Sequence, residues 1–232
     1  MGFLEDWDLS YDEINELLTD NPSLRSFVMG YAAEVKCRHL YFTDHPDVTD
    51  VQKYDDHDRL KKGDIAFKYK GHDFTVEVKS IQSNSMRVRK DGTVRPNFQC
   101  DASDRRVVRF KDGSEVNTTS LLVGEFDLLA VNLHAFYGEW RFAFAKNGDL
   151  PRLNGRRGAA KHFTEYQRQN LLSTLMPMAN PPIEPYLLDD PFTLLDELIE
   201  ERRRGLEPEL GDNVAALVSV PGTEQVARVE PI

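Results

Sequence analysis

Three charged residues on two adjacent predicted strands have types and spacing suited to the hydrolysis of a phosphodiester bond. In residues 63–70 (GDIAFKYK) and 73–81 (DFTVEVKSI), apolar and polar side chains alternate, and only Gly71-His72 separates the two segments. This pattern predicts a β-hairpin. Side chains two apart on a strand project to the same side, so Glu77 and Lys79 stand side by side. Asp64, at the start of the partner strand, can lie close to both.

Two converging carboxylates form an oxygen-rich site suited to Mg²⁺ or Mn²⁺. Such an ion neutralises charge that develops on a phosphodiester and lowers the pKa of a bound water. A lysine beside it can orient or deprotonate that water, or stabilise the transition state. The sequence therefore predicts metal-dependent hydrolysis carried by Asp64, Glu77 and Lys79.

The elements before the hairpin read as two helices. In residues 10–19, Ser10 and Glu13 have the spacing of a capping box. A second helix is predicted from Pro22 to about Phe42. Its apolar residues recur at helical spacing, so we expect one stripe to face a core. That stripe comprises Leu24, Phe27, Val28, Tyr31, Val35 and Leu40.

The segments after the hairpin read as a mixture of strands, helices and polar loops. We expect short strands or a hairpin near 93–99 and 105–110, a short crossover helix over 114–124, strands over 125–133 and 139–145, and helices near 164–176 and 191–204. A polar loop precedes the hairpin at 43–62, a Gly/Arg-rich loop spans 146–161, and an acidic tail that we expect to be loose follows Gly205.

Charge is segregated along the chain. The net charge of −10 combines 5 Lys/Arg against 14 Asp/Glu in residues 1–60, 20 against 13 in 61–182, and 4 against 12 in 183–232. Such segregation can place a basic working surface on an acidic protein, or the acidic flanks can simply confer solubility.

A basic segment, 83–113, follows the hairpin directly, where a nuclease would grip a phosphate backbone. The residues expected to contact nucleic acid are Arg87, Arg89, Lys90, Arg95, Arg105, Arg106 and Arg109. A solvated polar loop is the alternative. A second cluster (Arg152, Arg156, Arg157, Lys161) could cradle a phosphate or be an ordinary loop.

The string Gly63-Asp64-Ile65, twelve residues, then Glu77-Val78-Lys79 resembles the restriction-endonuclease-like members of the PD-(D/E)xK nuclease superfamily. The resemblance covers roughly 22–133. It implies that Asp64 and Glu77 bind the metal and that Lys79 assists the attacking water. It also implies an α/β fold with a central mixed β-sheet flanked by helices, and a restriction or phage-defence setting. Gly63 departs from the Pro that names the motif.

The same resemblance suggests two auxiliary residues. Glu34 matches a further acidic position that some members add to the metal site, and Gln82 matches a polar position near the metal or substrate. Each could instead be an ordinary surface residue. Glu34-Val35-Lys36 repeats the tripeptide of residues 77–79, but on a helix, where residues two apart diverge. The alternative for the hairpin itself is an exposed face with a salt bridge.

Composition limits the other function classes. The 232 residues are 40% hydrophobic, enough for one core, and we expect a nuclease domain over 1–182 followed by a C-terminal helix and tail over 183–232. No run of eighteen apolar residues predicts a membrane span, and the acidic N-terminus does not resemble a secretory signal. Cys37 and Cys100 read as core residues, which favours a reducing, cytoplasmic location. Zinc, phosphate-loop and dinucleotide motifs are not seen.

The sequence thus predicts an Mg²⁺-dependent endonuclease, with Mn²⁺ as a substitute, acting on DNA. RNA is not excluded as a partner, and a homodimer stays open because cutting both strands often needs two sites. Two alternatives share the fold. One is a nuclease on structured DNA or RNA, and the other is a non-catalytic nucleic-acid-binding module.

Overall fold

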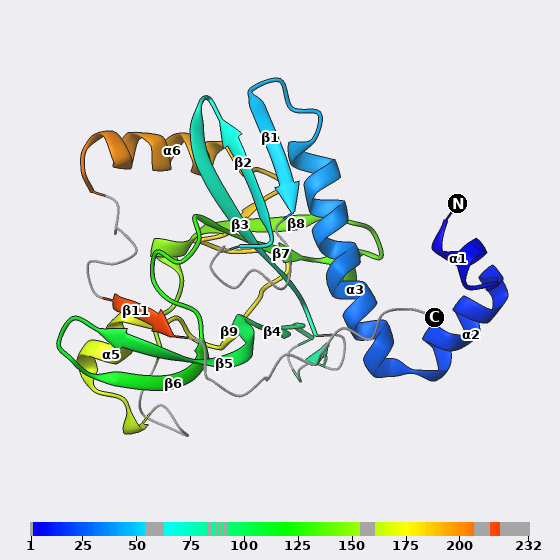
Figure 1. Ribbon diagram of the computed structural model, residues 1–232, viewed down its shortest axis with the longest axis horizontal. Coiled ribbons are helices and arrows are strands. Elements are labelled where there is room, and N and C mark those ends of the chain that lie inside the picture. Colours follow the sequence, from blue (N-terminus) through cyan, green and yellow to red (C-terminus); the bar gives the residue numbers. More distant parts are fainter. Residues whose placement is uncertain are drawn as a thin grey trace, which may run out of the picture.

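A six-stranded mixed β-sheet forms the centre of the molecule (Figure 1). The computed structural model describes residues 2–53, 63–82, 85–86, 88, 90, 92–153 and 161–206, and the backbone of 214–218. In spatial order the sheet contains β1 (Val48–Lys53), β2 (Ile65–Tyr69), β3 (His72–Ser80), β7 (Leu128–Asn132), β8 (Phe142–Lys146) and β10 (Leu187–Leu188).

The predicted hairpin is present as β2 and β3, paired antiparallel from Ile65↔Val76 to Tyr69↔His72. β7 pairs parallel to β3, with Lys79 opposite Val131, and the other neighbours in the sheet are antiparallel. The sheet is therefore mixed, and the parallel pairing of β3 with β7 requires a crossover connection between these two strands.

Two smaller sheets are formed by strands that come between β3 and β7 in the sequence and by strands that come after β8. The first has the order β11 (Val214–Val218), β5 (Asp101–Phe110), β6 (Glu115–Ser120), and the second pairs β4 (Asn97–Gln99) with β9 (Leu175–Pro177). The strand β11 falls in the tail that we expected to be loose, so that expectation does not hold for these five residues. No helix among the described residues is long and apolar enough to cross a membrane.

The helices are α1 (Phe3–Asp6), α2 (Tyr11–Asp20), α3 (Pro22–Cys37), α4 (His134–Tyr137), α5 (Glu165–Asn170) and α6 (Phe192–Arg203), with a π-helical segment η1 (Arg38–Phe42) and a 3₁₀ turn η3 (Asn147–Asp149). The capping box is confirmed, because Ser10 Oγ accepts from the Glu13 N–H at 3.2 Å and Glu13 accepts from the Ser10 N–H at 2.8 Å. The second predicted helix also begins at Pro22, and through η1 it ends at Phe42.

Both faces of the central sheet are buried, but by different elements. Phe74, Val76 and Val78 of β3 pack into a core shared with the C-terminal half of α3 and with α6. On the other face, Leu129 and Val131 of β7 pack in a second core with residues of β4 and β9. The alternation predicted for β3 is confirmed, and it leaves Glu77 and Lys79 on the face opposite α3.

Three sequence predictions are wrong for segments around the hairpin. The polar loop predicted over 43–62 contains the strand β1, which pairs with β2 although most of its side chains are exposed at the edge of the sheet. The crossover helix over 114–124 is instead the strand β6, paired with β5. Val116, Thr118 and Ser120 alternate inward, and such β-branched and hydroxyl residues suit a strand better than a helix. The helix near 164–176 ends at Asn170, because residues 175–177 pair with β4 as β9.

The predicted core stripe of α3 is also wrong. Phe27, Val28, Tyr31, Val35 and Leu40 are exposed. The buried residues of this helix and its extension are Ala33, Cys37 and Phe42, on a different face. Periodicity identified an apolar stripe correctly, but it could not tell which stripe meets the sheet.

Candidate active site

Asp64 is held at the start of the hairpin by local backbone geometry. Its N–H donates to the Val76 carbonyl at 2.8 Å, so strand pairing extends one residue beyond β2. Gly63 before it has φ +76°, and a Cβ there would lie 3.0 Å from the Thr75 Cβ and 3.2 Å from the Val76 oxygen. Only glycine fits this position without strain.

The Asp64 carboxyl is crowded by other acids. Its Oδ2 accepts from the Val78 N–H at 2.7 Å, which fixes the carboxyl beside β3. Burial, followed by the charges of Glu77 and Glu34, raises the pKa of Asp64 well above its usual value, against the opposing effects of Lys79 and the Val78 hydrogen bond. Burial among other acids therefore disfavours the charged form of Asp64.

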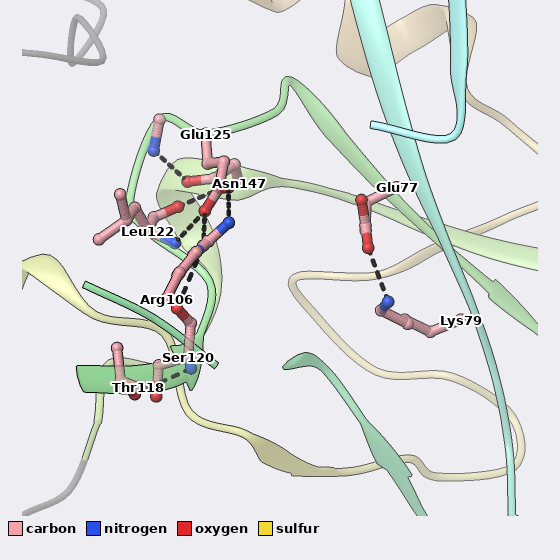
Figure 2. Close-up of polar contacts among 9 residues, drawn as sticks. Glu77, Lys79, Arg106, Thr118, Ser120, Leu122, Glu125 and Asn147 are labelled. Atoms are coloured by element: carbon pink, nitrogen blue, oxygen red, sulfur yellow. Dashed lines mark hydrogen bonds and ion pairs between the residues drawn. The ribbon is translucent and has the colours of Figure 1, made fainter. Parts of the chain in front are cut away.

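Glu77 and Lys79 form an ion pair on the same face of β3 (Figure 2). Lys79 Nζ lies 2.6 Å from Glu77 Oε1, with side chains 21% and 12% exposed. Burial alone would lower the pKa of the Lys79 ammonium, but the charges of Glu77 and Asp64 outweigh it and hold this pKa above its usual value. Lys79 is thus protonated at neutral pH, which suits orientation of a water or charge stabilisation rather than proton abstraction.

Glu34 lies within electrostatic reach of Asp64 but has its own cation. Its Oε2 is 3.0 Å from Lys53 Nζ of β1, and the same ammonium lies 4.4 Å from the centre of the Tyr31 ring. The structure therefore brings Glu34 to the edge of the site, with part of its charge already compensated.

A preformed three-ligand metal centre is not seen: in the described ranges, no three His, Cys, Asp or Glu side chains converge closely enough to hold a metal. The donor chemistry nevertheless fits a hard divalent cation, because the carboxyl groups of Asp64 and Glu77 lie on paired strands of one hairpin and interact electrostatically. One Asp64 oxygen is used in the bond to Val78, and Glu77 would have to turn from Lys79 to join it.

Gln82 links the end of β3 to β4. Its N–H donates to the Asn97 carbonyl at 3.2 Å, and its Nε2 donates to Gln99 Oε1 at 2.6 Å. In this arrangement the Gln82 side chain braces the two strands, and its auxiliary role stays a prediction.

The described basic residues of the segment after the hairpin are mostly exposed, with Arg106 as the exception. Arg87 and Arg89 lie outside the described residues, whereas Lys90 and Arg95 are exposed. The other three lie on β5. Arg105 is exposed and reaches the Asn117 carbonyl at 3.5 Å, and Arg109 pairs with Glu115 at the surface. These environments leave the exposed members accessible to a phosphate backbone.

Arg106 instead belongs to a buried network (Figure 2). Both of its terminal nitrogens donate to the Glu125 carboxylate, which is 3% exposed and also accepts from the Leu122 N–H at 2.8 Å. Asn147 completes the network by donating to the Leu122 carbonyl at 3.0 Å and accepting from the Gly124 N–H at 2.6 Å. These contacts tie β5 to the segment that leads into β7, so Arg106 has a structural role here.

The sequence prediction missed an acid beside Lys79. The isolated antiparallel bridge Ile81↔Phe98 runs β4 alongside the end of β3 and brings Cys100 and Asp101 near the site. Burial raises the pKa of Asp101, and the Lys79 charge opposes the shift. Cys100 is a buried free thiol, as expected of a core cysteine, and its burial raises the pKa to about 12. Asp101 could not be assigned to the site from the sequence, because its position depends on this bridge between Ile81, just after β3, and Phe98 of β4.

Asp127, just before β7, bonds to the hairpin and to α6 rather than to Asp64, Glu77 or Lys79. It accepts from the Thr75 N–H at 2.6 Å and from Arg202 Nη2 of α6 at 2.6 Å. The ion pair with Arg202 compensates the charge of this half-buried acid and ties β7 to α6.

A hollow of about 650 Å³ is lined by residues of β1, β2 and the first half of β3, together with Asp127. Its lining includes Asp50, Asp73 and Asp127 but a single cation, Lys68, and none of Asp64, Glu77 or Lys79. An acidic hollow repels phosphate, so we do not place the nucleic-acid backbone there.

Comparisons with protein-family models, with curated proteins and with solved structures found no match to this chain.

Proposed function

We propose that the chain hydrolyses phosphodiester bonds in nucleic acid, most readily DNA, in an Mg²⁺-dependent reaction. The observation that carries this proposal is the meeting of Asp64, Glu77 and Lys79 at the open end of one hairpin, with Asp64 bonded to the Val78 N–H between the other two. An exposed salt bridge would not need a buried carboxyl with a raised pKa beside it.

The residues divide the work by charge. Asp64 and Glu77 would hold Mg²⁺, which when bound supplies a Lewis acid and lowers the pKa of a water. Lys79 keeps its proton and donates hydrogen bonds to the attacking water or to a phosphoryl oxygen, stabilising the charge that develops there. Val76 and Val78 anchor the strand in the core and hold these side chains in place.

The sheet supports a restriction-endonuclease-like fold without identifying it. The antiparallel order β1-β2-β3 followed by parallel β7 agrees with the central mixed sheet that the family resemblance implies, and α3 covers one face of it. The β5–β6 hairpin stands where the crossover helix was expected, so this part of the chain departs from the expectation.

A second candidate function is a nucleic-acid-binding module without catalysis. The observation that favours it is the direct pairing of Glu77 with Lys79, together with the lack of three converging metal ligands in the described part of the chain. In that module the exposed Lys90, Arg95 and Arg105 would bind the phosphate backbone, and the hairpin acids would be inert.

The two functions are separated by incubating the protein with supercoiled plasmid, single-stranded DNA and RNA, in Mg²⁺ or in EDTA. The nuclease predicts cleavage of at least one substrate in Mg²⁺, none in EDTA, and none by Glu77→Gln under either condition. Gel-shift binding without cleavage of any substrate would instead identify the non-catalytic module.

A further inference from the structure

The first helices of the chain lie apart from both cores. We call residues 2–32 the N-terminal arm: it contains α1, α2 and the first two thirds of α3, and none of its residues is buried. Figure 1 shows α1 and α2 at one end of the molecule, away from the central sheet. Helices of 4 and 10 residues, such as α1 and α2, are marginal in water without tertiary contacts, so an arm with an uncovered apolar surface calls for a covering partner.

The arm carries large apolar side chains in regular positions. Its exposed members are Phe3, Trp7, Tyr11, Leu17, Phe27, Val28, Met29 and Tyr31. On α3 the spacing of Phe27, Val28 and Tyr31 forms one stripe, which Val35 continues toward the C-terminal end of the helix. The rings of Phe3 and Trp7 contact each other edge to face at 5.9 Å, so α1 adds its aromatic residues as a pair.

The exposed area is close to what one side of a stable interface buries. The five aromatic residues of the arm are 48 to 82% exposed. At about 150–250 Å² for each aromatic side chain, this is roughly 500–800 Å² of aromatic surface. A standard interface buries about 800 Å² on each partner, whereas the largest apolar patch of a monomer is about 300–600 Å².

Charge restricts what can cover the arm. Residues 2–21 contain seven Asp or Glu and no Lys or Arg, so the arm repels nucleic acid and anionic membranes. The exposed face of α3 instead carries Arg25 and Lys36. A second copy of this chain therefore offers both an apolar stripe and a basic flank for the acidic α1–α2 segment.

We propose that the N-terminal arm, together with the exposed face of α3 that continues it to Lys36, is the interface of a two-fold symmetric homodimer. The acidic α1–α2 segment of one copy packs along α3 of the other, and the same contact is repeated in reverse, as an isologous interface requires. The dimer does not depend on the proposed nuclease activity, since its interface excludes Asp64, Glu77 and Lys79.

The mass in solution tests the dimer directly. Light scattering coupled to size-exclusion chromatography, at about 1 to about 100 µM protein, should give twice the chain mass of 26.6 kDa. Trp7→Ser with Phe27→Ser should halve that mass. Because both residues are exposed, the fold should survive, as circular dichroism can verify. Ile183→Ser, an equally exposed apolar residue outside the arm, should remain dimeric.

Charge reversal tests the pairing of the two copies. Glu16→Lys with Asp20→Lys, and separately Arg25→Glu with Lys36→Glu, should each weaken the homodimer, whereas mixing the two variants should restore a dimer of one copy of each. A monomer at every concentration, including one that binds a different protein, would overturn the proposal. So would a dimer that the Trp7 and Phe27 substitutions leave intact.

Discussion

Two arginines of β5, three residues apart, form ion pairs in different environments. Arg106 pairs with Glu125 in the interior, and Arg109 pairs with Glu115 at the surface. In the first pair the side chains are 16% and 3% exposed, and in the second both are 50% exposed. Replacing Arg106 with Met leaves the Glu125 carboxylate buried without its partner, which costs about 3–5 kcal/mol. Replacing Arg109 with Met should cost about 0–1 kcal/mol.

The two variants should therefore differ by about 3 kcal/mol in the free energy of unfolding, or about a hundredfold in the folding equilibrium constant. Urea unfolding followed by circular dichroism at neutral pH measures both. Combining Arg106→Met with Glu125→Leu should recover much of the loss, because no buried charge then lacks a partner. If the free energies of unfolding of Arg106→Met and Arg109→Met differ by less than about 1 kcal/mol, the structural role assigned to Arg106 is refuted.

Three further predictions concern the hairpin. Asp64→Asn should raise the free energy of unfolding by about 0.5–2 kcal/mol at neutral pH, because it removes a negative charge that burial and the charges of Glu77 and Glu34 disfavour. Since the folded-state pKa of Asp64 is raised, protonation removes the same unfavourable charge from the wild type as the pH falls. The difference in melting temperature between wild type and variant should therefore narrow in acid, and a difference that stays constant with pH would contradict this cause. Gly63→Ala should cost more stability than Gly71→Ala, because both have positive φ but only Gly63 has neighbours within 4 Å; equal losses would count against the close contact. Mg²⁺ at about 100 times its dissociation constant should stabilise the wild type by about 2.7 kcal/mol, increasingly so as the pH rises and Asp64 loses its proton, and it should not stabilise Glu77→Gln.

Local signals were enough to predict the hairpin and its same-face pair. Alternation and a two-residue turn define β2 and β3, and these same features place Glu77 beside Lys79. The need for Gly63 could not be read from the sequence, because it arises from contact with Thr75 and Val76 across the hairpin.

Features that depend on long-range contacts were harder to predict. The sequence could not tell that Arg106 is buried against Glu125 whereas Arg109 stays at the surface, since a run of charges does not identify its partners. Asp101 was missed because its approach to Lys79 depends on β4 pairing with β3. The α3 stripe was assigned to a core because periodicity reports that a face is apolar, not what covers it.

The active-site assignment is tested most directly by the rate at which matched variants cleave a preferred nucleic-acid substrate in the presence of Mg²⁺. Asp64→Asn, Glu77→Gln and Lys79→Met should each lower the single-turnover rate at least about a hundredfold while remaining folded and able to bind. Two controls, Lys70→Met at the turn of the same hairpin and Glu200→Gln on α6, should cleave at the wild-type rate, because both side chains form surface ion pairs away from the site. Cleavage that survives all three hairpin substitutions, or that proceeds equally well in EDTA, would contradict the assignment of the active site.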